Sequence, residues 1–210
     1  MLWSLLALAS PPPPGLFAEG GWSPHNERHG VTVQAKVLDG RGRTAFRGIY
    51  PLPDDVDLET LFAVINDIEG AVNIGDRLEE SRLLSSGPSG IAFYQVLRDP
   101  LGPVAARWWL NTAQVERDLD GVVGHHRRTW QSADADTWLE ARADIQARYP
   151  DAVEVGGTWG AWEVVPATRT LIYTTLTDPG GKVPDALYTT VSGRTLPDNM
   201  LDFVQTARDK

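Results

Sequence analysis

Residues 178–208 read DPGGKVPDALYTTVSGRTLPDNMLDFVQTAR, and this stretch decides the expected fold. Its first seven residues are rich in glycine and proline, which are typical of turns. From Pro184 to Arg208 the apolar residues recur at roughly helical intervals. The pattern predicts one long amphipathic helix at the end of the domain. We expect a kink at Pro197, because proline lacks the N–H group that a helix interior needs.

The chain before this helix is dominated by predicted β-strands. Clusters of turn-forming residues separate short segments whose apolar and polar residues follow a strand pattern. Strands joined by such short turns are expected to be antiparallel neighbours. Residues 134–151 fit either a helix or an extra strand plus a loop, and we favour a strand at 138–143. The other predicted strands are residues 78–84, 91–98, 106–117, 122–131, 158–165 and 170–178.

A hairpin and two helices are predicted nearer the N-terminus. Residues 31–38 and 44–52 alternate on either side of an Asp-Gly-Arg-Gly turn, as the strands of a β-hairpin do. Aspartates then precede a segment that starts at Leu58 and places its apolar residues on one helical stripe. We expect this helix to end near Gly70 and a short second helix to run to about Ile74.

These elements predict an α+β fold in which a curved antiparallel sheet wraps around the C-terminal helix. One face of such a sheet must be covered by apolar residues, and the last helix is the available cover. The chain also contains eight tryptophans. Because each large aromatic side chain buries roughly 150–250 Å², the tryptophans form either a bulky core or the wall of an internal cavity between sheet and helix.

The composition limits the class of protein. The 210 residues suit one domain, and 42% hydrophobic with 22% charged residues is typical of a folded globular chain. There are 28 acidic and 19 basic residues, a formal net charge of -9, which repels nucleic-acid phosphates and anionic lipid headgroups. The absence of cysteine excludes disulfides and thiol nucleophiles. We expect a monomer that binds no nucleic acid.

Residues 1–21 are predicted to precede the folded domain, which is expected to span residues 22–210. Residues 1–9 read MLWSLLALA and end in a small-x-small sequence like that of signal-peptidase sites, but no basic residue precedes the apolar run. The prolines at 11–14 form a stiff spacer. We interpret the segment as an export signal or membrane tether. The alternatives are a disordered tail or an upstream start, and without a signal we expect a cytoplasmic protein.

Two segments resemble a known family. Residues 58–70, LETLFAVINDIEG, resemble the helix after the first hairpin of START-type lipid-transfer domains, and the stretch from Gly160 to DPGGKVP at 178–184 resembles the closing sequence of that family. The resemblance covers about residues 22–208. It implies the helix-grip fold of the START and polyketide cyclase superfamily, with an internal cavity for one sterol, phospholipid, polyketide or other lipid-like molecule. Some members of the superfamily are instead cyclases or hydroxylase components.

The resemblance also implies a position for polar recognition. Sterol-binding members of the family often bury an acid and an arginine on adjacent strands, whereas the comparable positions here hold Gln95 and residues 111–113. We therefore expect a neutral cavity in which an amide bonds a hydroxyl or carbonyl group without the cost of an unpaired buried charge. The alternative is that Gln95 is an ordinary solvent-facing strand residue.

Strand alternation predicts which residues face the ligand. Trp108 and Trp109 are adjacent, so they point to opposite faces, and an inward Asn111 places Trp109 inward as well. Phe93 shares its face with Gln95 by the same rule. The terminal helix is expected to add apolar residues, although core packing explains each of these singly. The complete predicted ligand-binding set is Phe93, Gln95, Trp109, Asn111, Trp162, Tyr173, Leu187, Val191 and Met200.

No metal site, cofactor or catalytic residue is predicted. His125 and His126 are neighbours on a strand, so their rings diverge. His25 and His29 have the spacing of a helical metal pair, but barely one turn is available and no third ligand is evident. The sequence contains no G-x-S-x-G nucleophile motif and no phosphate-binding glycine motif.

The leading functional prediction is a carrier of one lipid or sterol-like molecule. Burying an apolar ligand contributes about 25 cal/mol per Å², so little polar recognition is needed. We expect the loop 99–104 and the kinked terminal helix to gate entry, and we allow for transient contact with a membrane. The less favoured alternative is a cyclase or aromatase acting on a polyketide, with Tyr173, Arg127 or Arg128 in acid–base roles. A third is an assembly module with a filled interior.

Overall fold

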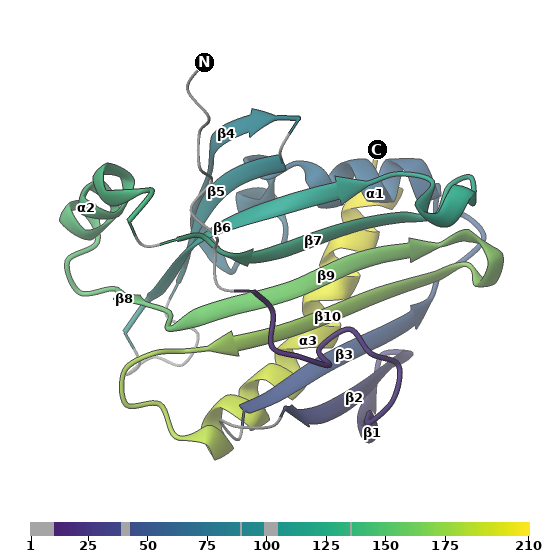
Figure 1. Cartoon of the computed structure of the whole chain (residues 1–210). Helices are drawn as coiled ribbons and strands as arrows, with labels where there is room; N and C mark the ends of the chain where they lie inside the picture. The colour runs from purple at the N-terminus through teal and green to yellow at the C-terminus, as the bar shows by residue number, and fades with distance from the viewer. Residues whose placement is uncertain (1–10, 39–42, 89, 99–104, 135) are drawn as a thin grey trace.

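The computed structural model describes residues 11–38, 43–88, 90–98, 105–134 and 136–210. Within these residues ten strands form one sheet and three α-helices pack against it, which confirms the predicted α+β fold (Figure 1). The apolar segment 1–9 and the predicted gate loop 99–104 lie outside the described residues. No helix in the described part of the chain is both long and apolar enough to cross a membrane.

The strands follow the predicted antiparallel pattern. The order across the sheet is β1-β2-β3-β10-β9-β7-β6-β5-β4, with β8 beside β6. The pairing of β6 with β8 is parallel, and all the other pairings between described strands are antiparallel. The strands are β1 Ser23–Arg28, β2 Val31–Leu38, β3 Arg43–Pro51, β4 Leu78–Gly87, β5 Gly90–Leu97, β6 Arg107–Glu116, β7 His126–Ser132, β8 Val153–Glu154, β9 Gly157–Val165 and β10 Thr170–Asp178.

Strand β7 begins later than the pattern predicts. The expected strand starts at residue 122, but residues 119–121 form a short 3-10 helix and β7 starts at His126. Asp118 and Asp120 have φ angles of 51° and 55°, and Gly121 and Gly124 also have positive φ. These left-handed conformations cannot continue a strand, so the chain turns before β7.

The first helix, α1 (Leu58–Asn66), starts where the sequence predicts. The carboxylate of Asp57 accepts a hydrogen bond of 2.7 Å from the Thr60 amide, which satisfies one of the free N–H groups at the start of the helix. The helix ends at Asn66, before the predicted Gly70, and a separate 3-10 helix, η1 (Gly70–Asn73), follows. The short second helix is therefore present, but as a 3-10 turn.

The C-terminal helix α3 (Asp185–Arg208) crosses the inner face of the sheet, and α1 lies on the same side (Figure 1). The main core lies between them and combines Phe46 and Val33 of the sheet with Phe62 of α1 and Val204 of α3. The helix continues through Pro197 without interruption. Pro197 therefore does not divide α3 into two helices.

The prediction of a strand at 138–143 is wrong, because residues 139–148 form helix α2 (Leu139–Arg148). Ile145 is fully buried, and Trp138 and Tyr149 pack beside it on the outer face of β5 and β6. Trp138 and Ile145 are seven residues apart, so a strand would place them on opposite faces, whereas a helix places them on one. The helix sequence LEARADIQAR contains few apolar residues, so its helical periodicity is weak.

The outer face of the sheet also holds residues that precede Trp22. Leu16 is 1% exposed and packs against Leu38, Trp159 and other residues of the outer face. The Lys36 ammonium donates hydrogen bonds of 2.6 and 3.0 Å to the carbonyls of Gly15 and Ala18. Packing therefore begins upstream of the predicted boundary at residue 22, as Figure 1 shows by the segment that crosses the sheet.

Candidate functional site

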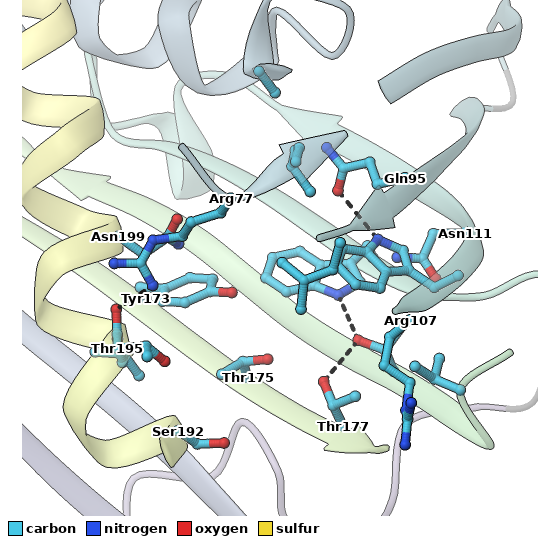
Figure 2. A pocket seen from close by; sticks show the side chains of 18 of the residues that line it. Arg77, Gln95, Arg107, Asn111, Tyr173, Thr175, Thr177, Ser192, Thr195 and Asn199 are labelled. Atoms are coloured by element: carbon cyan, nitrogen blue, oxygen red, sulfur yellow. Dashed lines mark hydrogen bonds between the residues drawn. The ribbon is translucent and has the colours of Figure 1, made fainter. Parts of the chain in front are cut away.

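A pocket of about 630 Å³ lies between the inner face of the sheet and α3 (Figure 2). Residues of β4, β5, β6, β7, β9 and β10 form one wall, and α3 with the end of α1 and η1 forms the other. The volume falls within the roughly 300–1,000 Å³ of small-molecule pockets. The strand alternation and the amphipathic helix thus leave space at the site where the sequence predicted a ligand.

Stacked aromatic rings form the apolar part of the pocket. Tyr173 stacks on Trp162 with ring centroids 4.0 Å apart and on Trp130 at 5.8 Å, and Phe203 of α3 contacts Trp162 at 5.0 Å. Gly160 leaves the space that the Trp130 ring fills, because a Cβ atom there would overlap it. All four aromatic residues line the pocket.

A chain of hydrogen bonds fixes the polar side chains of β5 and β6. The Trp109 indole N–H donates to Gln95 Oε1 at 3.1 Å, and Gln95 Nε2 donates to Ser81 Oγ at 3.0 Å. Ser81 in turn donates to the carbonyl of Ile68 at 2.5 Å. Since indole N–H only donates, this chain sets the orientation of the Gln95 amide. Gln95 faces the pocket, and the expectation of a solvent-facing residue does not hold.

Asn111 brings an unsatisfied polar atom to the pocket. Its side chain is 1% exposed, and its Oδ1 atom has no hydrogen-bond partner among the residues that the structure describes. Figure 2 shows it beside Gln95 on the sheet wall. A buried acceptor without a donor costs about 1–3 kcal/mol, and a hydroxyl or amide of a bound molecule would supply the missing donor.

Arg128 overturns the expected neutral pocket. It lines the pocket from β7 and is 7% exposed. Its Nη1 donates to the carbonyl of Ile65 near the end of α1, which is the one hydrogen bond of this side chain to the described residues, and its buried Nε has no partner there. Burial lowers the pKa of Arg128 to about 10, so the guanidinium stays charged at neutral pH.

Three further arginines lie around the pocket. Arg77 donates at 3.2 Å to the carbonyl of Thr195 on α3, and Arg107 donates at 2.7 Å to that of Pro179. Arg98 pairs with Asp76 at 2.5 Å. The pocket lining therefore holds four arginines and two aspartates, Asp67 and Asp76, whereas the chain as a whole has a formal net charge of -9.

The tyrosines of the pocket are poor proton donors and acceptors at neutral pH. Burial raises the pKa of Tyr173, although the charges of Arg128 and Arg77 act in the opposite direction. Burial also raises the pKa of Tyr188, whose hydroxyl accepts a 3.1 Å hydrogen bond from the Thr177 amide. Both side chains consequently stay neutral and act as hydrogen-bonding groups.

The two neighbouring histidines bond different carboxylates on opposite faces. His126 is 2% exposed on the inner face, where its Nε2 lies 2.5 Å from Glu59. Its Nδ1 accepts from the Asp118 amide, so the proton is on Nε2. His125 lies 2.8 Å from Glu163 on the outer face. Each ring therefore has a structural partner of its own.

Eight of the nine predicted ligand-binding residues line the pocket: Phe93, Gln95, Trp109, Asn111, Trp162, Tyr173, Leu187 and Val191. The ninth, Met200, is fully buried and packs against Gly48 of β3 in the core outside the pocket wall. Sequence reasoning missed Trp130 and the binding potential of Arg128. His126, Arg128 and Trp130 are spaced two residues apart on β7, so their side chains share one face of the sheet. This period of two along residues 126–132 is the sequence signal that identifies Arg128 and Trp130.

Solved structures with similar folds include START-domain proteins. Human STARD10 is 20% identical and matches with a TM-score of 0.70 over 91% of this chain and 75% of that one. A STAR-related lipid transfer protein from Xanthomonas axonopodis is 20% identical, with a TM-score of 0.67 over 90% of this chain and 97% of that one. Human StAR-related lipid transfer protein 5 is 15% identical, with a TM-score of 0.68 over 91% of this chain and 86% of that one.

These likenesses confirm the predicted START-type helix-grip fold. Comparison with protein-family models and with curated protein sequences gives no match. At 15–20% identity the likeness concerns the fold, and the choice of ligand depends on the side chains of this pocket.

Proposed function

We propose that this protein binds one hydrophobic, lipid-like molecule in the pocket and carries it without changing it. The observation that carries the proposal is the combination of stacked Trp130, Tyr173 and Trp162 rings with a buried Asn111 acceptor that lacks a partner. A ligand that covers the rings gains about 25 cal/mol per Å² of buried apolar area, and its polar group satisfies Asn111. The fold of START-type lipid-transfer proteins supports this proposal.

The protonation state of the polar groups in the pocket favours a carrier over a cyclase of the same fold. Acid–base catalysis near pH 7 works best with groups whose pKa lies near that value. Burial instead moves the pKa of Tyr173 upward, and Arg128 keeps its proton with a pKa of about 10. These groups suit the recognition of a ligand rather than proton transfer.

The proposal is tested by filling the pocket. Ser192 of α3 lines it, and a Ser192→Trp substitution would occupy the space that the ligand needs (Figure 2). The matched control is Thr190→Trp, because Thr190 is exposed on the same helix and does not line the pocket. Native mass spectrometry of the protein after incubation with fatty acids, sterols and phospholipids measures one-to-one complexes.

We expect the wild type and Thr190→Trp to hold one molecule of at least one lipid class, and Ser192→Trp to lose at least about tenfold in affinity. Thermal unfolding of the three proteins checks that each is folded. A folded Ser192→Trp protein that retains full binding, or a wild type that binds no member of the panel, would contradict the proposal.

A further inference from the structure

The inference concerns the charge of the ligand and rests on the proposed binding function. Arg128 is a buried cation that faces a pocket, and no described carboxylate forms an ion pair with it. Placing an ion in a low-dielectric interior costs several kcal/mol unless a counter-charge and hydrogen bonds offset the cost. The Arg128 guanidinium therefore lacks the partner that buried charges ordinarily have.

The end of α1 supplies only part of that compensation. The Arg128 Nη1 donates to the Ile65 carbonyl in the last turn of the helix, where the helix dipole amounts to about half a negative charge. A guanidinium carries a full positive charge and five N–H donors. The buried Nε–H remains without a described partner, so both charge and hydrogen-bonding capacity are left over.

Other cationic and donor groups surround the same space. The charges of Arg128 and Arg77 both act on the hydroxyl of Tyr173, which burial keeps protonated and able to donate. Figure 2 shows Arg77 beside the Tyr173 ring at the α3 side of the pocket. Arg77 lies at 3.9 and 3.8 Å from Asp198 and Asp202, at the limit of an ion pair. Arg128, Arg77 and Tyr173 all line this pocket, so a bound anion has two guanidinium groups and a hydroxyl available to it.

We infer that the ligand is an anionic amphiphile whose carboxylate or phosphate pairs with Arg128 and Tyr173. The apolar remainder of the molecule lies against the Trp130 and Trp162 rings, which flank Tyr173. Along β7, Arg128 is four residues from Ser132, which pairs with Asn111, so the backbone positions of Arg128 and Asn111 are offset by about 13 Å along the strand direction. This offset is consistent with an apolar segment of the ligand between the two polar contacts.

The experiment compares three probes that share one alkyl chain: hexadecanoic acid, hexadecyl phosphate and methyl hexadecanoate. Quenching of the pocket tryptophans measures their affinities at pH 8, below the critical micelle concentration. A hydrogen bond to a charged group contributes more than a neutral one, and we expect at least one anionic probe to bind the wild type about tenfold or more tightly than the ester. The acid and the phosphate arms distinguish the two sources of the anion.

Two variants test whether Arg128 causes the preference for the anionic probes. Arg128→Met removes the charge but keeps an apolar stem, and we expect the preference for the anion over the ester to disappear. Arg127→Met is the matched control, because Arg127 is its neighbour on β7 but lies on the outer face, beside the Phe17 ring. This variant should keep the wild-type preference.

The outcomes separate the inference from the proposed function. If the ester binds the wild type as tightly as both anions, the inference is wrong and hydrophobic binding stands. If none of the three probes nor any other lipid binds, the proposed function fails as well. Should Arg128→Met not fold, the ester-to-anion ratio of the wild type still decides. A role of Arg128 confined to capping α1 predicts a ratio near one.

Discussion

Asn26 of β1 bonds the Gly193 carbonyl of α3 at 3.1 Å, the carbonyl that Pro197 leaves without a helical N–H partner. Proline at position 197 removes the hydrogen bond from residue 197 to residue 193. The Asn26 amide replaces it from the edge strand. Gly193 also lets the two elements approach, because a Cβ atom there would overlap the His25 ring. A helix with an internal proline is thereby held against β1.

Replacing Asn26 with Ala should lower the free energy of unfolding by about 1 kcal/mol, because the Gly193 carbonyl loses its donor. Urea denaturation measures this free energy of unfolding. In a Pro197→Ala background the restored N–H can bond Gly193, so the cost of Asn26→Ala should shrink. Equal costs in both backgrounds would show that the two residues are not coupled.

Gly48→Ala should destabilise the protein by about 1–3 kcal/mol. A Cβ atom at this position of β3 would overlap Met200 and Leu196, which are almost completely buried. The control is Gly87→Ala, since a Cβ atom at Gly87 meets nothing within 4 Å. Thermal melts of the two variants should differ clearly, and a Gly48→Ala melt like that of the control would contradict this packing.

Gln95→Leu should destabilise the protein by about 1–3 kcal/mol. The substitution leaves the Trp109 indole N–H without its acceptor and Ser81 without its donor. Gln114→Leu on β6 is the control, because Gln114 is exposed. Urea unfolding reports the stability, and tryptophan emission of the folded protein reports the altered surroundings of Trp109. An unchanged midpoint for Gln95→Leu would mean that this chain of hydrogen bonds adds nothing.

Stability should fall in acid partly through Glu80. Partial burial raises its pKa, but hydrogen bonds from Arg148 and Tyr94 outweigh burial and lower the pKa below its ordinary value. A lowered pKa contributes stability above the unfolded pKa, and this contribution is lost as the pH falls through the folded pKa. Glu80→Gln should therefore flatten the acid side of the pH–stability curve, whereas Glu79→Gln, its exposed neighbour on β4, should not. Identical pH–stability curves for Glu80→Gln and Glu79→Gln would contradict this role of Glu80.

Leu16→Ala should cost about 2–5 kcal/mol, the range for truncating a buried leucine. The segment before Trp22 should then be cleaved faster by proteases, since its main apolar contact with the sheet is lost. Val37→Ala is the control because Val37 is 67% exposed on β2. Wild-type stability and protease resistance for Leu16→Ala would argue that this segment does not pack on the sheet.

The pocket was partly readable from the sequence because strands alternate with a period of two. The family resemblance put Gln95 and Asn111 at the cavity, alternation added Phe93 and Trp109 to the same wall, and the structure shows all four there. The same rule applied to β7 would have placed Arg128 among them. From the sequence, Arg127 and Arg128 are both acid–base alternatives in a cyclase; because neighbours on a strand face opposite sides, Arg128 lines the pocket and Arg127 lies on the outer face beside Phe17.

Other features depend on contacts between distant parts of the chain. Helix α2 has few apolar residues, and its burial is decided by the outer face of β5 and β6 rather than by its own pattern. Met200 has the helical phase of a pocket residue, yet the approach of β3 at Gly48 encloses it in the core. The position of a residue along a helix stripe does not specify which strand it meets.

By itself the sequence determined most of the strands, their antiparallel pattern and the helix that closes the sheet, because periodicity and turn residues act over short distances; it did not determine α2, where a strand was predicted. The tertiary structure alone decided that α3 stands far enough from β6 and β7 to leave a pocket, and that a charged Arg128 lies inside it without a carboxylate among the described residues. Volume and charge pairing arise from side chains that are far apart in the chain, so no local pattern encodes them.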